Sequence, residues 1–223
     1  MTSVAAGLET ATESRTATIQ ARIDAAIDDV LASLPNPEEL SGDDRRGIIA
    51  RYTAVLEGNF IYWMTGAYLS VSSDEARAKI IDNLREEVRD CHPGMMRRFA
   101  IAAQAVPSAD DADAVYRNLM NVRQFIGRLD PVPVVVTMAF FEGFIQRFMS
   151  YLADLARRQG SAEMEYTDVH GVCDITHTQE LFRALDAEMA LAPPAAVDNP
   201  FEGMELLRVL IQNIVVHNAV RES

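Results

Sequence analysis

DPVPVVVTMAFFEGFIQRFMSYLADLARRQG, residues 130–160, is the stretch that decides the fold class. Its first part, VPVVV, is rich in β-branched residues and has the character of a β-strand. A strand needs a partner, however, and no other segment of the sequence has the pattern of one. We therefore expect a long buried helix here and an all-α fold.

Helical patterns fill most of the remaining chain. Ser72 followed by Glu75 forms a capping-box pattern that starts one helix. His92 before Pro93 ends it, because a residue before proline avoids the α region. Another capping pattern, Asn199 with Pro200 and Glu202, starts the last helix. The sequence predicts a bundle of seven or eight helices, within residues 16–34, 44–71, 74–90, 94–105, 111–129, 130–160, 167–191 and 200–223.

Length and composition indicate one globular domain. The chain has 223 residues, of which 49% are hydrophobic, and this is enough for a single core. We expect one helical domain over residues 1–223, with residues 1–12 as a flexible N-terminus. A formal net charge of -13 excludes nucleic acid as a partner, because nucleic-acid binders need a basic face.

The N-terminal stretch has neither a basic start nor an apolar run of about 18 residues that could span a bilayer. We therefore expect no membrane partner and a cytoplasmic location. The two cysteines, Cys91 and Cys173, are too few for a disulfide framework and do not form a CxxC metal motif.

Two of the four histidines lie close together in YTDVHGVCDITHTQEL, residues 166–181. At about 100° per residue, the steps of four and seven place His170, Asp174 and His177 on one face of a helix. Imidazole and carboxylate donors suit iron, zinc, copper or manganese. The alternative interpretation of this face is a partly exposed polar surface.

Further candidate donors lie in two other segments. Glu142 is surrounded by apolar residues, so its carboxylate must be paired, protonated or metal-bound if that face is buried. Glu86 and Glu87 precede His92 closely, and the break at His-Pro is needed for Glu87 and His92 to face one metal. Each of these carboxylates also has the plainer interpretation of a solvated helix face. His217 has no such neighbour and is interpreted as a packing or surface histidine.

Together these residues resemble the pattern of the haem-oxygenase-like di-iron oxidases and oxygenases. The hallmarks of that family are an NLxxEE helix followed by a histidine, an isolated glutamate on a central helix, and H-x3-D-x2-H. By offset from the asparagine, Glu87 matches the family's ligand better than Glu86, although the spacer to His92 is shorter than expected. The resemblance covers about residues 45–190, and its matching residues are Asn83, Leu84, Glu86, Glu87, His92, Glu142, His170, Asp174 and His177.

The resemblance implies a haem-oxygenase-like bundle with two iron ions, cycling between Fe(II) and Fe(III), and O2 as co-substrate. In such sites the two metals lie about 3.5–4 Å apart. Carried over to this sequence, Glu87 and His92 bind one iron, and Asp174 with His177 or His170 binds the other. Glu142 bridges the two. Glu87, Glu142 and Asp174 are therefore also the expected catalytic residues.

Glu57 is a further metal-ligand candidate, because N-oxygenating members of the family carry an extra carboxylate from an earlier helix. An additional anionic oxygen would stabilise oxidised iron, since carboxylate suits hard Fe(III). If Glu57 binds metal, the resemblance favours N-oxygenation of a small amine or amino-acid-derived substrate in natural-product biosynthesis. If Glu57 is only an exposed residue of an amphipathic helix, oxidative C–C bond cleavage is an equal candidate.

Two other classes of function remain open. One is a metal-free, thiaminase-like member of the same fold, and the other is a non-enzymatic acidic interaction protein. The family also suggests a homodimer with a small-molecule substrate. Five large apolar residues are candidates for the walls of a substrate cavity, although such residues most often form core: Trp63, Met64, Phe140, Phe144 and Phe148.

Overall fold

The structure, a computed structural model, describes residues 2–191 and 199–216. Within these residues the chain forms helices and no strand, which confirms the predicted all-α bundle. The helices are α1 (Thr2–Ala32), α2 (Gly42–Leu56), α3 (Asn59–Ser70), α4 (Asp74–Arg89), α5 (His92–Ala102), α6 (Ala109–Ile126), α7 (Pro131–Arg158), α8 (Glu165–Leu191) and α9 (Glu202–Val215).

The expected helix over residues 44–71 is divided in two. Gly58 has φ of 78°, a left-handed conformation that glycine adopts without steric cost, and it separates α2 from α3. Because of this break, the described part of the chain contains nine helices where seven or eight were expected. The break at His-Pro is confirmed, since α4 ends at Arg89 and α5 begins at His92.

α7 is the central helix of the bundle. It packs against α1, α2, α3, α8 and α9, and every residue from Val132 to Ile145 is buried. A helix that is apolar on all sides belongs inside the protein, and this burial outweighs the low helix propensity of the valines. The strand-like start of the segment is therefore the first turns of a core helix, which begins at Pro131.

By length and composition α7 would also be long enough to cross a bilayer. In the structure, 89% of its most apolar window is buried against the other helices, as in the core helix of a globular protein. The absence of a membrane partner and the cytoplasmic location stay predictions.

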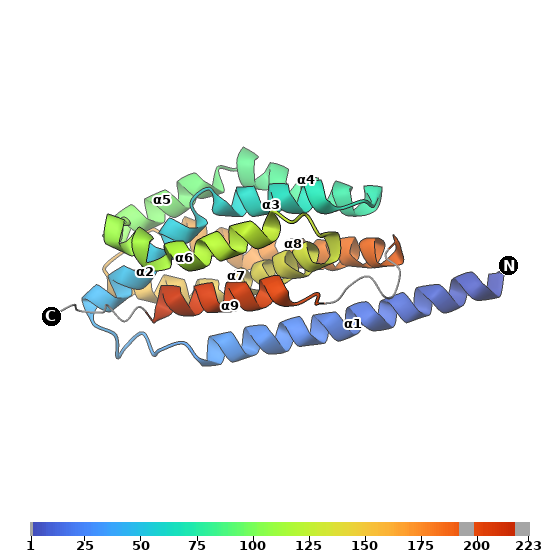
Figure 1. Cartoon of the computed structure of the whole chain (residues 1–223). Helices are drawn as coiled ribbons and strands as arrows, with labels where there is room; N and C mark the ends of the chain where they lie inside the picture. The colour runs from blue at the N-terminus through green and yellow to red at the C-terminus, as the bar shows by residue number, and fades with distance from the viewer. Residues whose placement is uncertain (1, 192–198, 217–223) are drawn as a thin grey trace.

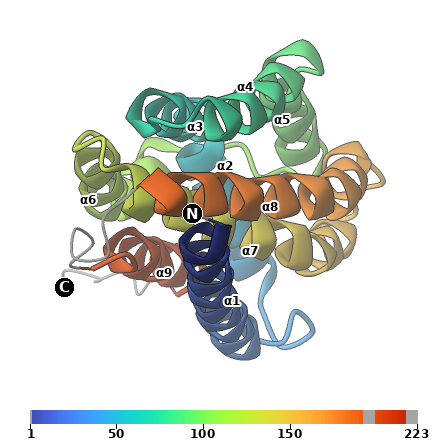
Figure 2. The same cartoon turned by 90° about the vertical axis from the view of Figure 1, so that its right-hand side faces the viewer.

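The helices that carry the candidate donors are neighbours. α8 packs along α7 and also contacts α4 and α5, and α4 contacts α5. Figure 2 shows α8 crossing the middle of the bundle, with α3, α4 and α5 on one side and α1 and α9 on the other. α1 runs along the outside of the bundle, and its N-terminal end projects beyond the other helices (Figure 1).

Several predicted boundaries differ in detail. Ser73, not Ser72, caps α4, because its side chain accepts a hydrogen bond from the backbone N–H of Ala76. α9 begins at Glu202, two residues after the expected start. Residues 217–223, the expected end of that helix, lie outside the described residues. The buried apolar residues form one core cluster, while the single domain and the flexible N-terminus at 1–12 stay predictions.

Glu188 fixes α8 to the start of α4. Its side chain is 2% exposed, and one carboxylate oxygen accepts hydrogen bonds from the backbone N–H groups of Ser72 (2.8 Å) and Ser73 (2.6 Å). A carboxylate is also favourable at a helix N-terminus. This contact sets the position of α4, and therefore of Glu87, against α8.

Replacing Glu188 with alanine is expected to lower the free energy of unfolding by about 2–3 kcal/mol, because two N–H groups lose a charged acceptor. Urea denaturation of the metal-free protein measures this change. Glu188→Gln keeps an acceptor oxygen and is expected to lose clearly less. Equal stability of the alanine variant and the wild type would show that the contact does not hold the helices.

Candidate metal centre

Six of the seven predicted metal ligands come together between four helices. They are contributed by α4, α5, α7 and α8, and each is at most 5% exposed. Three are imidazoles and three are carboxylates, which are the nitrogen and oxygen donors that suit iron. The six residues are Glu87, His92, Glu142, His170, Asp174 and His177.

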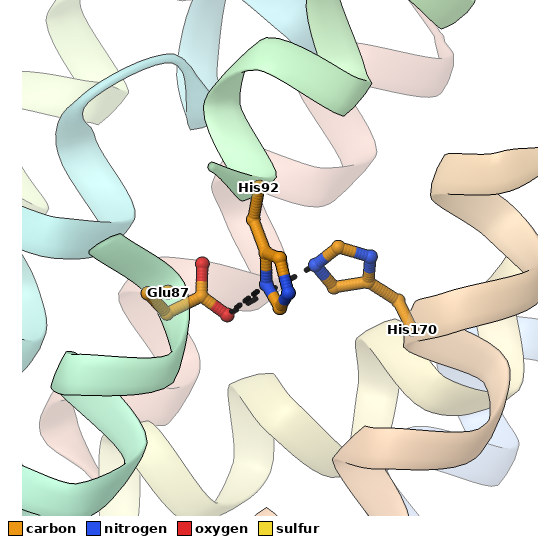
Figure 3. A group of neighbouring side chains, drawn as sticks. All are labelled: Glu87, His92 and His170. Atoms are coloured by element: carbon orange, nitrogen blue, oxygen red, sulfur yellow. Dashed lines mark hydrogen bonds and ion pairs between the residues drawn. The ribbon is translucent and has the colours of Figure 1, made fainter. Parts of the chain in front are cut away.

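The first group consists of Glu87, His92 and His170 (Figure 3). The His92 Nδ1 atom lies 2.7 Å from a carboxylate oxygen of Glu87, and the His170 Nε2 atom lies 4.0 Å from the same oxygen. The turn between α4 and α5 makes this possible, because Cys91 adopts a left-handed conformation (φ 57°) that directs His92 back towards Glu87. All three side chains point towards one another in Figure 3.

The second group lies on the α7 side of α8. The His177 Nδ1 atom is 3.5 Å from an oxygen of Asp174 and 3.8 Å from an oxygen of Glu142. The other oxygen of Glu142 accepts a hydrogen bond from the Asn83 amide at 2.7 Å. Cys173 completes a further possible ligand set with Asp174 and His177, and its thiol donates to Asp174 at 3.2 Å.

Two of the imidazoles are oriented by contacts outside the donor cluster. The His170 Nδ1 atom donates to the backbone carbonyl of Tyr166 at 2.8 Å, so Nε2 carries the free lone pair and faces Glu87. The His177 Nε2 atom lies 3.0 Å from a carboxylate oxygen of Glu86, which directs Nδ1 towards Asp174. A ligand histidine held in this way through its other nitrogen is typical of metal sites.

The surroundings of His170 keep its imidazole neutral, which is the form that binds a metal. Burial, and then the nearby charge of His92, lower the pKa of His170 to about 4. The ring is therefore unprotonated at neutral pH, the form in which imidazole binds metals. Burial raises the pKa of Glu87, while for His92 the effect of burial is outweighed by Glu87, which raises the pKa of the imidazole.

In the metal-free protein, bound protons supply the positive charge that a metal ion would bring to the second group. Burial, and then the charge of Glu142, raise the pKa of Asp174. Burial acts to lower the pKa of His177, but Asp174, Glu142 and Glu86 outweigh it and raise this pKa to about 11. His177 is therefore protonated at neutral pH in the metal-free protein.

Buried polar atoms without partners test whether the cluster suits a metal. Within the described residues, Asp174 Oδ2, His177 Nδ1 and Asn83 Oδ1 have no hydrogen-bond partner. Such atoms are costly to bury and are rare in native proteins. A cation coordinated by Asp174 and His177 would satisfy two of the three, so the residues present fit a metal centre.

The first group, together with Glu142 and Asp174 of the second group, lines a small cavity of about 30 Å³. A volume of this size holds about two water molecules, so the cavity has room for metal ions or O2. The residues that were expected to form the cavity walls are core residues instead, namely Trp63, Met64, Phe140, Phe144 and Phe148. The apolar wall consists of Leu56, Phe60, Ile61, Pro93, Met96, Phe141 and Ile145.

Glu57 is the predicted ligand that the structure does not bring to the cluster. It caps the C-terminus of α2, its side chain is exposed, and it forms an ion pair with Arg97. The left-handed Gly58 that follows turns the chain into α3, and the neighbouring Leu56 lines the cavity instead. The role of Glu57 as a ligand is corrected accordingly, and with it the argument for N-oxygenation.

Sequence reasoning did not identify Tyr166 and Tyr52. The hydroxyls of these buried residues are 2.8 Å apart, and Tyr166 lines the cavity with its ring 4.3 Å from the His170 ring. The available signal was spacing, because Tyr166 precedes His170 by one helical turn and shares its face. No sequence signal pointed to Tyr52, which comes from α2.

The pKa of His177 predicts that metal affinity rises with pH. A metal ion and a proton compete for the same nitrogen, so the proton must leave before the metal binds. Between about pH 6 and pH 8, below the pKa of about 11, affinity for Fe(II) is expected to rise about tenfold per pH unit for each proton displaced. Anaerobic Fe(II) titrations at several pH values measure this slope. A pH-independent affinity would contradict the assignment of His177.

A family model described as "iron-containing redox enzyme" matches residues 49–207, which is more than two-thirds of the chain. The matched range includes all six residues of the donor cluster. Among curated proteins and solved structures, no significant match is found.

Proposed function

The chain belongs to the family of iron-containing redox enzymes, and from this premise we propose that it is a non-haem di-iron oxygenase or oxidase. Membership confirms the resemblance that the sequence motifs indicate, and it makes the protein an iron-dependent oxidoreductase. The number of irons, the use of O2 and the substrate are parts of our proposal.

One observation carries the di-iron proposal: six buried donors fall into two groups, with a carboxylate between them. The first group, Glu87, His92 and His170, would hold one iron. Asp174 and His177 would hold the other, and Glu142, which lines the same cavity and lies 3.8 Å from His177, would bridge. Three imidazoles and three carboxylates provide three negative charges, which offset most of the charge of two divalent cations.

The residues around the donors have distinct tasks. The carbonyl of Tyr166 and the carboxylate of Glu86 hold His170 and His177 in fixed orientations. The apolar wall limits the number of water molecules near the donors, and the Tyr166 side chain lines the same cavity. Reduced iron, when bound, would supply the electrons that activate O2.

Two oxidations of a small-molecule substrate have equal support. N-oxygenation of an amine depended on Glu57 as an additional ligand, and Glu57 is on the surface. Oxidative C–C cleavage requires no additional carboxylate and therefore stands beside it. An amine or amino-acid-derived substrate, a role in natural-product biosynthesis and a homodimer stay predictions.

The metal-free alternative has weaker support. A thiaminase-like reaction through Cys173 would need a thiolate, but burial and then the charge of Asp174 raise the pKa of this thiol. The interaction-protein alternative does not account for six buried donors in a family of redox enzymes.

Anaerobic titration is expected to load two Fe(II) ions per chain, as a bridged site requires. Exposure of the loaded protein to O2 is then expected to consume O2 and oxidise both ions. Metal analysis after desalting and an oxygen electrode provide the two measurements. Binding of a single ion would contradict the di-iron proposal, and two bound ions that do not react with O2, with or without candidate amines, would contradict O2 activation.

A further inference from the structure

The donor cluster has two very different sides. All six donors are at most 5% exposed, so an incoming ion must pass between side chains to reach them. The side that faces α2 and α3 is the apolar wall, which a hydrated cation does not cross readily because it offers no replacement for water. A second side of the cluster, at His177, borders a groove of about 450 Å³ between α4 and α8.

This groove is polar along both of its helices. Its lining residues follow the steps 0, 3, 4 and 7 of a single helix face on each side, so the groove is the seam between two facing helices. α4 provides Lys79, Asp82, Asn83 and Glu86, and α8 provides Cys173, Thr176, His177 and Glu180.

Among the carboxylates that line the groove, Glu86 is the one whose ion-pair partner is a histidine, His177, and not a lysine or arginine. Glu180 pairs with Lys79 at 2.8 Å and with Arg183 at 3.2 Å, and Asp82 pairs with Arg85 at 3.2 Å. Glu86 forms no ion pair with a lysine or arginine of the described chain, and its side chain is 44% exposed. A cation in the groove therefore competes for Glu86 only with the His177 imidazole, which gives up its proton when a metal binds.

The inner end of the groove leads directly to the second donor group. Glu86 contacts His177 Nε2 at 3.0 Å, and the other nitrogen of this ring faces Asp174 and Glu142 at 3.5 and 3.8 Å. Asn83, also in the groove lining, is 5% exposed and donates its amide N–H to Glu142. Its amide oxygen has no partner in the described chain.

We propose that the groove between α4 and α8 is the route by which a divalent metal ion reaches the donor cluster, with Glu86 as its first ligand and the buried, free amide oxygen of Asn83 as the next. This inference rests on the proposed metal centre. Carboxylate and amide oxygens are hard donors that suit an incoming hydrated Fe(II) ion. Rotation of the half-exposed Glu86 away from His177 then opens the way to Asp174 and Glu142. Glu86 binds the ion only while it passes along this route, whereas Glu87 is a resident ligand, one that stays bound to the metal in the final site.

Uptake of Co(II) by the metal-free, full-length protein tests the route, because the visible absorption of bound Co(II) reports both the rate and the final occupancy. Glu86→Gln removes the charge but keeps an oxygen that accepts from His177. We expect its uptake rate to fall about 10-fold, with the same stoichiometry and spectrum as wild type at saturating Co(II). Thr176→Arg places a positive charge in the groove and is expected to slow uptake similarly. Added salt should slow the wild type more than either variant.

Glu75→Gln is the matched control, because it makes the same change at an exposed position of α4 outside the groove and is expected to leave the rate unchanged. Wild-type rates in both Glu86→Gln and Thr176→Arg would overturn the route. A changed spectrum, or one Co(II) fewer per chain, in Glu86→Gln at saturating Co(II) would also overturn it, since Glu86 would then be a resident ligand. If the wild type binds no Co(II) or Fe(II), the metal centre itself fails. Normal binding with unchanged variant rates removes only the route.

Discussion

Replacing His177 with alanine is expected to abolish the second metal site and to weaken its binding of iron by more than about 100-fold, because loss of a direct ligand exceeds the 10–100-fold effect of an outer partner. His177 is the only imidazole of the group that contains Asp174 and Glu142. The variant should therefore bind at most one Fe(II) tightly, and its reaction with O2 should be lost. Anaerobic Fe(II) titration followed by metal analysis measures the change.

Two further alanine variants are compared with His177→Ala. His170→Ala removes a ligand from the first group and is expected to weaken that site by a similar factor. His217→Ala is the matched control, since His217 lies outside the described residues and is predicted to take no part in the site. If His170→Ala and His177→Ala bind iron as the wild type does, the donor cluster is not the metal centre.

Replacing Glu142 with glutamine is expected to have the second large effect. Glu142 is 2% exposed, and its carboxylate is the one proposed to bridge the two groups. Glutamine keeps the size of the side chain and an oxygen for the hydrogen bond from Asn83, but removes the anionic oxygen between the ions. Turnover with O2 should fall by at least about 100-fold, because a two-metal site depends on the charge that holds both ions.

The same variant should change the stability of the metal-free protein little, because the relief of a buried charge is offset by the lost attraction to the protonated His177. Thermal unfolding of the metal-free form measures this separately from iron content and O2 consumption. Asp154→Asn is the matched control on α7, since Asp154 forms only a surface ion pair with Arg158. Unchanged O2 consumption by Glu142→Gln would contradict the bridging role.

Helical periodicity was sufficient to bring the α8 donors together. The steps of four and three between His170, Asp174 and His177 fix a common face, whatever the other helices do. The structure places this face inside the bundle, with all three residues at most 5% exposed. Glu142 was predictable for a related reason, since a carboxylate within so apolar a helix has no solvent-facing alternative once α7 is central.

The choice between Glu86 and Glu87 was not predictable from the sequence. Adjacent residues on a helix point about 100° apart, and which one faces the cluster depends on how α4 is rotated against α8. In the structure Glu87 is 4% exposed beside His92, while Glu86 is half-exposed in the groove. Contacts distant in sequence, including the one from Glu188 to the start of α4, set this rotation.

Glu57 shows where spacing along the chain is an insufficient guide. Its distance in sequence from Glu87 fits an additional ligand, but the left-handed Gly58 ends the helix immediately after it. A single residue in this conformation changes the direction of the chain, so α2 and α3 point in different directions. Glu57 therefore reaches Arg97 at the surface, whereas Phe60 and Ile61 beyond the break line the cavity.

Anomalous diffraction from crystals of the Fe(II)-loaded protein, recorded at the iron absorption edge, tests the central claim most directly. Our account predicts two anomalous peaks about 3.5–4 Å apart, one beside Glu87, His92 and His170 and one beside Asp174 and His177, with Glu142 between them. A single peak, or peaks away from these six residues, would contradict it.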